Sequence, residues 1–177
     1  MSTRPNRRSE HVVAAALQKL LPDVMAWLKR NGEDDTEEER KVVLEDLSEA
    51  ARWADPDGYE LAKNLDNAGW MPDAELVEIL DGLTSRLFEA EDAALKEWLP
   101  SSGLVAPAVG ATVTCKTNSG TYTGTVLSVK PEVGLSVVCV ASLGHTPVPG
   151  PKGGTRGFVI AWEDIVVVSP EKQEAKP

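Results

Sequence analysis

Few residues in this chain have the types and the spacing that chemistry requires. Two histidines, His11 and His145, and two cysteines, Cys115 and Cys139, are far apart in the sequence. Zinc sites use four clustered nitrogen or sulfur ligands, and these residues do not have a recognised spacing. We therefore expect no metal and no cofactor. We interpret both cysteines as buried free thiols on the inward faces of their strands.

Motifs for catalysis are also missing from the sequence. The stretch "GTYTGTV" lacks the G-K-[ST] ending of a phosphate-binding loop, and no nucleophile elbow occurs. Carboxylate pairs are numerous, but general acid–base catalysis also needs a cleft, and carboxylates on acidic helices usually form a solvated face. We predict that the protein is not an enzyme.

Carboxylates gather in the first part of the chain. Residues 1–100 contain 12 Lys/Arg and 23 Asp/Glu, a net charge of −11, whereas residues 101–177 contain 6 and 5, a net charge of +1. Such an asymmetry indicates two modules with different partners. A dense array of carboxylates can imitate nucleic-acid phosphates, and solubility is the simpler explanation. The candidates on this acidic face are Glu37, Glu38, Glu39, Asp55 and Asp57.

A long loop is the second candidate binding element. Residues 145–157, "HTPVPGPKGGTRG", present the side chains of His145, Lys152 and Arg156. Long loops on a rigid scaffold either carry a function or are flexible connections. We predict that this loop contacts a protein partner.

Residues 9–99 show helical periodicity, and we expect about four helices there. Ser9 is a suitable N-cap for the first helix. Pro22 lies inside the apolar pattern of that helix, so we predict a kink or a break near Leu21. Thr36 opens a capping box, T-E-E-E, ahead of the second helix.

The longest helix is expected over residues 72–99, after a short helix over residues 59–67. Its apolar residues recur at alternating spacings of four and three: Leu76, Leu80, Leu83, Leu87, Ala90 and Ala94. This stripe favours a bundle core, and a homodimer seam along the 72–99 helix is the alternative. Trp53, Tyr59 and Trp70 are predicted to pack at a corner between helices. If exposed, they would form a partner-binding hot spot.

Residues 109–169 have the period of strands. Alternation in "ATVTCK" places Ala111, Val113 and Cys115 on one face. Four further short strand-like segments follow. Five short strands are too few for two full sheets, so they predict a small, strongly bent barrel.

Glycines and valines near the first hairpin predict its geometry. Gly120 allows the positive φ that a tight hairpin needs, and Gly124 suggests a bend within a strand. Val126 and Val129 are three residues apart, so a bulge between them would turn both inward.

The strand segments carry a family resemblance. Its residues are Gly110, Val113, Gly120, Tyr122, Gly124, Val126, Val129, Val137, Asp164 and Ile165. Their rhythm resembles that of SH3-like small barrels of the Tudor and KOW type, over residues 109–168. This resemblance implies binding of methylated side chains in an aromatic cage, or contacts with RNA or protein. A cage needs several rings around one cation. Tyr122 occupies one matching position, and Phe158 and Trp162 are the other aromatic residues of note.

We take Tyr122 and Trp162 as candidate binding residues of the barrel. The barrel's net charge of +1 lacks the basic footprint of a phosphate-binding surface. Contact with nucleic acid is therefore less favoured than contact with protein.

These patterns together predict an α+β protein of two modules, a helical bundle followed by a five-stranded SH3-like barrel. The expected parts are a basic flexible arm (1–8), an acidic helical bundle (9–99), a linker (100–108), the barrel (109–169) and a disordered tail (170–177). No run of about 18 apolar residues occurs, so we expect no membrane contact. Two cysteines do not make a disulfide framework, which favours a cytoplasmic location.

Three functions follow from this organisation. The leading hypothesis is a non-enzymatic interaction or adaptor protein that binds a protein partner through the barrel and its 145–157 loop. A second is a regulator or inhibitor of a nucleic-acid-processing system of the phage or plasmid type, acting by nucleic-acid contact or by acidic mimicry. A third is a small-ligand or catalytic role at the junction of helices and barrel.

Overall fold

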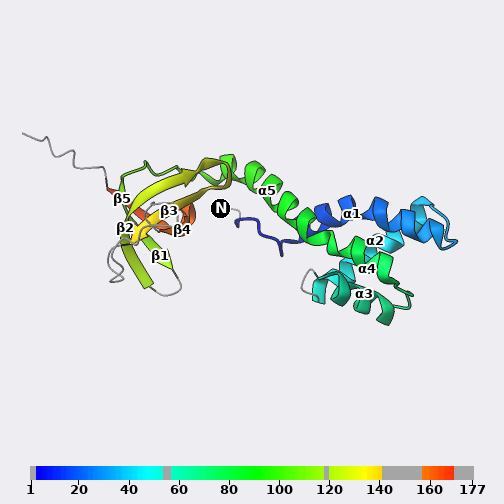
Figure 1. Ribbon diagram of the computed structural model, residues 1–177. Coiled ribbons are helices and arrows are strands. Elements are labelled where there is room, and N and C mark those ends of the chain that lie inside the picture. Colours follow the sequence, from blue (N-terminus) through cyan, green and yellow to red (C-terminus); the bar gives the residue numbers. More distant parts are fainter. Residues whose placement is uncertain (1–2, 54–56, 118–119, 141–156, 170–177) are drawn as a thin grey trace, which may run out of the picture. The chain divides into compact units, whose positions relative to one another are not determined.

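The chain consists of helices followed by a sheet. The computed structural model describes residues 3–53, 57–117, 120–140 and 157–169 (Figure 1). Two compact units divide the chain, which we call the helical unit, residues 3–94, and the sheet unit, from residue 95 onward. The predicted α+β order, with helices before an antiparallel five-stranded sheet, is confirmed. Within the described residues, no helix is both long enough and apolar enough to cross a lipid bilayer.

Five helices occur among the described residues, where about four were expected. They are α1 (Glu10–Arg30), α2 (Glu37–Trp53), α3 (Gly58–Asn67), α4 (Ala74–Asp81) and α5 (Leu83–Ser102). The long helix predicted over residues 72–99 is therefore two helices, separated at Gly82. The division between the two units falls within α5.

The end of α5 also differs from the prediction. We expected this helix to end at residue 99, before a linker over residues 100–108, but α5 continues to Ser102. The hydroxyl of Ser101 donates to the carbonyl oxygen of Trp98 at 2.8 Å, and that of Ser102 donates to the carbonyl oxygen of Leu99 at 2.7 Å. Both hydroxyls thus donate to carbonyl oxygens near the end of the helix, where backbone donors become scarce.

Helix α1 is not interrupted at Pro22. The helix runs from Glu10 to Arg30 as one element, and Pro22 lies on its exposed side. Apolar side chains before and after the proline are buried in the same core, among them Leu17, Leu20 and Val24. Their burial holds both halves of the helix in place and offsets the loss of one backbone hydrogen bond.

The leucine stripe of the predicted long helix forms the centre of the helical unit. Leu76, Leu80, Leu83 and Leu87 are all buried there, together with Ala90. They pack with the buried faces of α1, α2 and α3. The stripe is thus a bundle core within one chain, and its leucines are not exposed to a second copy.

Two tryptophans connect α1 to the segment before α4. The rings of Trp27 and Trp70 are stacked, with centroids 6.4 Å apart and planes within 4° of parallel. The indole N–H of Trp27 donates to Asp73 Oδ1 at 3.0 Å, and that of Trp70 donates to Asp46 Oδ2 at 2.9 Å. Trp70 therefore packs at a helix corner as predicted. Tyr59 does not, because it is 66% exposed at the start of α3.

The sheet has the strand order β4-β3-β2-β1-β5, and every neighbouring pair is antiparallel. The strands are β1 (Thr112–Thr117), β2 (Gly120–Lys130), β3 (Leu135–Val140), β4 (Phe158–Ala161) and β5 (Ile165–Ser169). Because the first strand pairs with the last, the sheet curls into a half-barrel (Figure 1). Its small core contains Val113, Cys115, Val126, Val138 and Ile160.

The predicted irregularities of β2 are present. Gly120 has a φ of 137° at the start of the strand. The pairing of β2 with β3 shifts between Val126 and Ser128, so Val126 is buried and Val129 also packs against the core. This shift is the predicted bulge. Gly124 is buried so closely against β3 that any side chain there would collide with the carbonyl oxygen of Cys139.

The inward orientation of Cys139 was predicted wrongly. Cys139 is half-buried, whereas its neighbour Val138 is fully buried and faces the core. Successive side chains of a strand point to opposite faces, so Cys139 lies on the outer face of β3. The other buried residue on this face is Ser136, two positions before Val138. Because Ser136 is polar, the alternation of apolar and polar residues along β3 does not reveal which face is buried.

Candidate functional site

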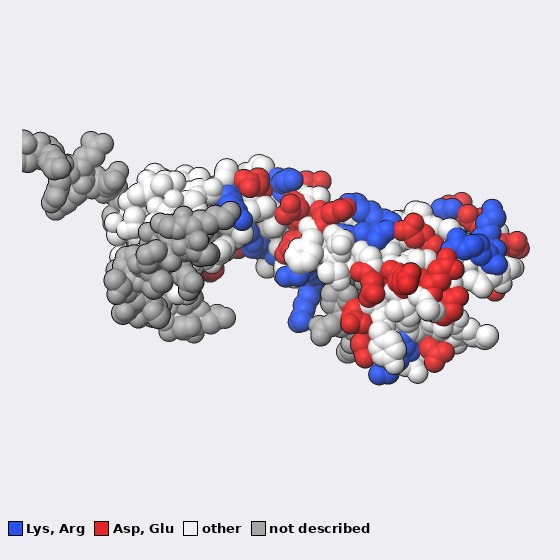
Figure 2. All heavy atoms as spheres, viewed as in Figure 1, with Lys and Arg blue, Asp and Glu red and all other residues white. Residues whose placement is uncertain are grey.

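Charged groups are distributed very differently over the two units. On the visible face of the helical unit, acidic and basic side chains lie close together (Figure 2). The described surface of the sheet in the same view is almost free of charge. On this face, the scarcity of charge favours contacts with protein over contacts with phosphate groups.

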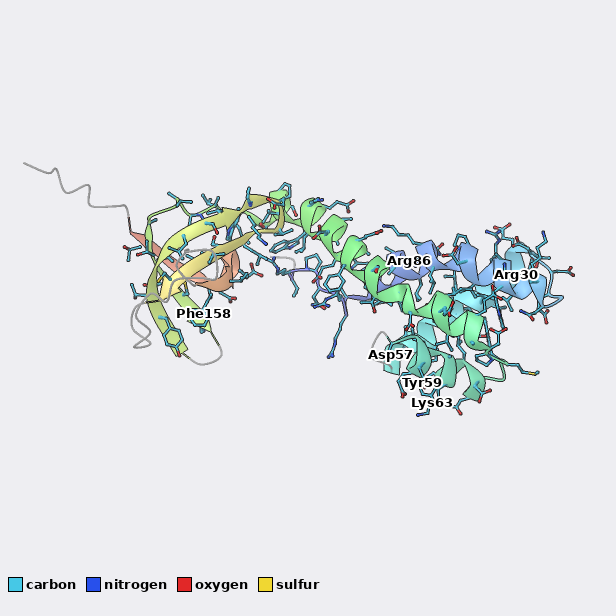
Figure 3. The ribbon with its side chains drawn as sticks, viewed as in Figure 1. Arg30, Asp57, Tyr59, Lys63, Arg86 and Phe158 are labelled. Carbon is cyan, nitrogen blue, oxygen red and sulfur yellow. The ribbon has the colours of Figure 1, made fainter. Side chains whose placement is uncertain are left out.

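Strand β4 forms one edge of the sheet and exposes two apolar side chains. Phe158 is 48% exposed and Val159 is 62% exposed. Phe158 pairs with Val138 of β3 and lies at the end of the sheet (Figure 3). In the described part of the chain β4 pairs with β3 and with no other strand. Within the described residues, one side of its backbone therefore has no strand partner.

The composition of β4 offers no protection of this edge. Natural edge strands usually carry charged residues, proline or a bulge, which prevent pairing with other chains. The four residues of β4, "FVIA", include none of these, and its pairing with β3 has no register shift. Strand β5 is the other edge, where Val166 is 61% exposed. Of the two edges, β4 is the one that presents an exposed aromatic ring, the residue type most often found in interface hot spots.

Two predicted binding residues of the sheet contribute to its core. Tyr122 is half-buried and packs against the core cluster. Trp162 is buried, and its indole N–H donates to Ser136 Oγ at 2.9 Å. A buried ring whose donor already has an acceptor has no face for a ligand, so we remove Trp162 from the binding residues. His145, Lys152 and Arg156 lie outside the described residues.

No protein-family model, characterised protein or solved structure matches this chain. Function is therefore inferred from the geometry of the chain itself.

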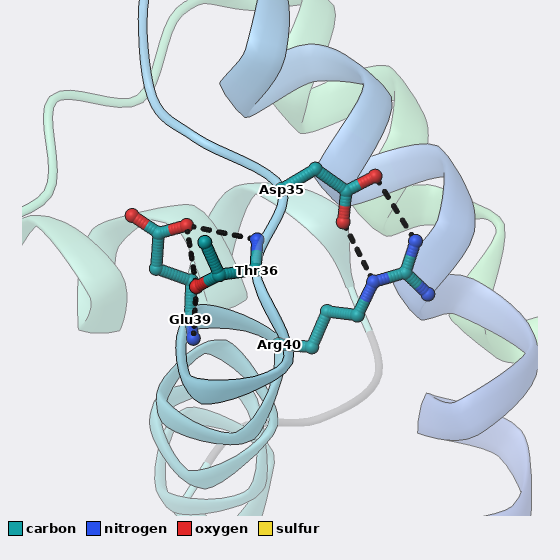
Figure 4. Close-up of polar contacts among 4 residues, drawn as sticks. All are labelled: Asp35, Thr36, Glu39 and Arg40. Atoms are coloured by element: carbon teal, nitrogen blue, oxygen red, sulfur yellow. Dashed lines mark hydrogen bonds and ion pairs between the residues drawn. The ribbon is translucent and has the colours of Figure 1, made fainter.

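Part of the acidic face consists of residues that begin helices. Glu39 accepts hydrogen bonds from the backbone N–H and the hydroxyl of Thr36 at 3.1 and 3.0 Å, while its own N–H donates to Thr36 Oγ1 at 3.2 Å (Figure 4). The predicted capping box is thus confirmed. Asp57 caps α3 by accepting from the backbone N–H groups of Tyr59 and Glu60.

A neighbouring carboxylate is engaged in an ion pair. Asp35 binds the guanidinium of Arg40 through both of its oxygens, at 2.6 and 3.0 Å (Figure 4). The hydrogen bond from Arg40 lowers the pKa of Asp35. Glu37 and Glu38 are exposed in the first turn of α2, where negative charge stabilises the helix dipole. Asp55 lies outside the described residues. These roles in the fold weaken the case for phosphate mimicry.

Metal binding and thiol chemistry have little basis in the described part of the chain. There, no group of three or more His, Cys, Asp or Glu side chains is placed to hold a metal ion. Cys115 is buried in the sheet core, and burial, followed by the nearby charge of Asp164, raises the pKa of its thiol. A thiol with a raised pKa is a poor nucleophile at neutral pH.

Sequence reasoning missed the exposed residues of β4. Phe158 was considered only as a member of an aromatic cage, and Val159 was not singled out. The missed signal was the composition of "FVIA" together with its position next to a long loop, because a strand without charges needs either neighbours on both sides or a partner.

Proposed function

We propose that this chain is a non-enzymatic interaction protein whose sheet unit docks a protein partner along β4. The partner supplies an extended segment that pairs with the free side of β4 and continues the sheet. Phe158 and Val159 provide apolar contacts to its side chains. The 145–157 loop, which leads directly into β4 in the sequence, provides a second contact.

One observation carries this proposal: among the described residues, the short edge strand β4 is apolar and partly exposed, and it has no charge, proline or bulge. Backbone hydrogen bonds to an added strand provide affinity, and pockets for alternate side chains provide specificity. An edge strand without charge, proline or bulge favours aggregation, because it can pair with other copies of the chain. Such an edge is therefore expected where it binds a partner. Burial of an aromatic ring adds the largest single contribution to such an interface.

The strand arrangement supports an SH3-like barrel as the scaffold. Antiparallel neighbours β1 to β4 follow one another in sequence, and β5 returns to pair with β1. A single 3-10 turn, Trp162–Asp164, connects β4 to β5. This connectivity agrees with the Tudor- and KOW-type resemblance of the sequence, and domains of that kind commonly bind protein or RNA.

The proposal is tested by comparing the two edges. Tagged full-length protein is used to capture partners from an extract of its own cells, alongside the variants Val159→Asp and Val166→Asp. Each variant places one carboxylate on an exposed edge position, so both have the same net charge. A third variant replaces residues 145–156 with glycine and serine.

The expected result is a partner that the wild type and Val166→Asp retain and that Val159→Asp loses. Replacing the loop should weaken its capture. Recovery of the same partners by all variants would contradict docking at β4. Circular dichroism of each variant checks that the fold is unchanged.

A further inference from the structure

A groove with an apolar base lies in the helical unit, away from the features considered so far. It has a volume of about 1090 Å³ and is lined by residues of α1, α2, α3 and α5 and by the segment before α1. Leu61, Leu83 and Leu87 form its buried base. Val13, Ala14 and Ala51 line its walls, and these smaller side chains leave the space between the helices open.

Arginine is the most frequent charged residue along the rim of this groove. Arg7, Arg8 and Arg52 line it, against the two carboxylates of Glu10 and Glu91. Residues 3–94 as a whole contain 11 Lys/Arg and 22 Asp/Glu. The groove therefore reverses the charge balance of the unit that contains it. Except for Glu91, which is half-buried, these charged residues are exposed, so the charges lie at the rim and the leucines at the base.

One rim arginine is held in position by its neighbours. The guanidinium carbon of Arg7 lies 4.4 Å from the centre of the Phe88 ring, and its Nε is 3.4 Å from Glu91 Oε2. A cation over an aromatic face is attracted to it. Arg52 pairs with Glu49 at 3.1 Å on an exposed surface. Exposed pairs of this kind contribute little, so Arg52 can exchange that partner for another carboxylate.

We propose that this groove binds an amphipathic helix of a protein partner, with Asp and Glu residues flanking the apolar face of that helix. The apolar side chains of the helix, spaced at three and four residues, enter the groove and contact the partly exposed side chains of Val13, Ala14 and Ala51 above the buried leucines. Its flanking carboxylates meet Arg7, Arg8 and Arg52 at the rim.

The distribution of charge favours a helix over a small molecule. Small-molecule sites place polar groups among apolar ones inside an enclosed pocket, with volumes of roughly 300 to 1,000 Å³. Here the charged groups lie along the rim of the groove, as they do in grooves that bind amphipathic helices. Alanine at two wall positions, Ala14 and Ala51, allows the backbone of a helix to approach closely.

The test uses two fluorescent model peptides and the full-length protein. Each peptide has about 18 residues, enough for a stable amphipathic helix, with leucines at positions i, i+3, i+4 and i+7. One carries Glu beside the leucine stripe and the other carries Lys at the same positions. Fluorescence anisotropy measures their dissociation constants. We expect the Glu peptide to bind at least about tenfold more tightly, with a preference that decreases as salt is added.

Two matched pairs of variants locate the binding. Ala14→Trp fills the groove, whereas Ala26→Trp places the same side chain on an exposed position of α1 that does not line it. Arg8→Glu reverses a rim charge, whereas Lys29→Glu makes the same charge change at an exposed position of α1 outside the groove. Ala14→Trp and Arg8→Glu should each weaken binding of the Glu peptide by about fivefold or more, and each control by less than about twofold.

Several results would overturn the proposal. Equal binding of the two peptides would exclude charge complementarity, and unchanged binding by Ala14→Trp and Arg8→Glu would place the site elsewhere. A homodimer that Ala14→Trp dissociates would assign the groove to a second copy of the chain. Displacement of a fluorescent fatty acid from the groove, without binding of the Glu peptide, would assign it to a lipid.

Discussion

The helical unit and the sheet unit bury very different numbers of side chains. Among the described residues, nineteen buried residues form the core of the helical unit and five form that of the sheet unit. The helices bury broad apolar faces against one another, whereas the curled sheet has one small inner face. Stability in the helical unit is therefore distributed over many leucines, and in the sheet unit it depends on a few contacts. The sheet, in turn, leaves apolar residues on its edges.

The largest effect is expected in the core of the helical unit. Leu80 is fully buried in α4, and Leu80→Ala should lower the free energy of unfolding of this unit by about 3 kcal/mol, because the cavity adds to the lost burial. Val42→Ala is the control, since Val42 is exposed on α2. Urea denaturation followed by circular dichroism at the helix band measures both. A change below about 1 kcal/mol for Leu80→Ala would show that the distributed core tolerates this loss.

In the sheet unit, the loss of one hydroxyl, that of Ser136, should lower the free energy of unfolding by the next largest amount. Ser136→Ala leaves the buried indole N–H of Trp162 without its acceptor, at a cost of about 1 to 3 kcal/mol. Native-state hydrogen exchange of the β3 amides reports the free energy of opening of this unit. Ser128→Ala, at an exposed position of β2, is the control. The double variant with Trp162→Phe should recover part of the loss, and full additivity of the two substitutions would contradict the hydrogen bond.

A carboxylate with two roles gives a smaller effect in the helical unit. Asp73 accepts from the indole of Trp27 and, at 2.8 Å, from the backbone N–H of Leu76, where it caps α4. Asp73→Ala should lower the free energy of unfolding by about 1 to 2 kcal/mol. Asp46→Ala removes only an indole contact, that of Trp70, and should cost less. Equal losses would show that the cap of α4 contributes nothing.

The smallest effect is expected in the labelling of the two cysteines, which lie on opposite faces of the sheet. Iodoacetamide should modify the half-buried Cys139 before the buried Cys115, as measured by mass spectrometry of the peptides. Burial raises the folded-state pKa of Cys115. Its contribution to stability is therefore complete below the thiol's unfolded pKa of about 8.5 and is lost as pH rises through the folded value. Cys115→Ala should remove this alkaline loss, and equal labelling rates of both thiols would contradict their assigned faces.

Local signals in the sequence predicted much of the fold. The capping box at Thr36, the positive φ of Gly120 and the bulge between Val126 and Ser128 follow from short-range sterics and hydrogen bonding, so residue types at fixed spacings suffice to predict them. The spacing of the leucines predicted a buried core correctly, although the helix is divided into α4 and α5 at Gly82. The leucines on both sides of Gly82 are buried in the same core.

Tertiary packing decided the features that the sequence did not predict. Pro22 does not break α1, because the apolar residues on both sides are buried in one core. Cys139 faces outward, because Ser136 occupies an inward position of β3, where its hydroxyl accepts the hydrogen bond of the Trp162 indole N–H. Ser136 and Trp162 are far apart in the sequence, so no local pattern indicates their contact. The groove beneath Arg7 and Arg52 combines residues from four helices, so no local pattern could indicate it.

Hydrogen–deuterium exchange of the protein, alone and with its captured partner, tests docking at β4 most directly. Strand addition forms backbone hydrogen bonds, so the amides of residues 158–161 should exchange more slowly in the complex, while those of residues 165–169 should not change. Protection of β5 without protection of β4, or no change in either edge on binding, would contradict the account.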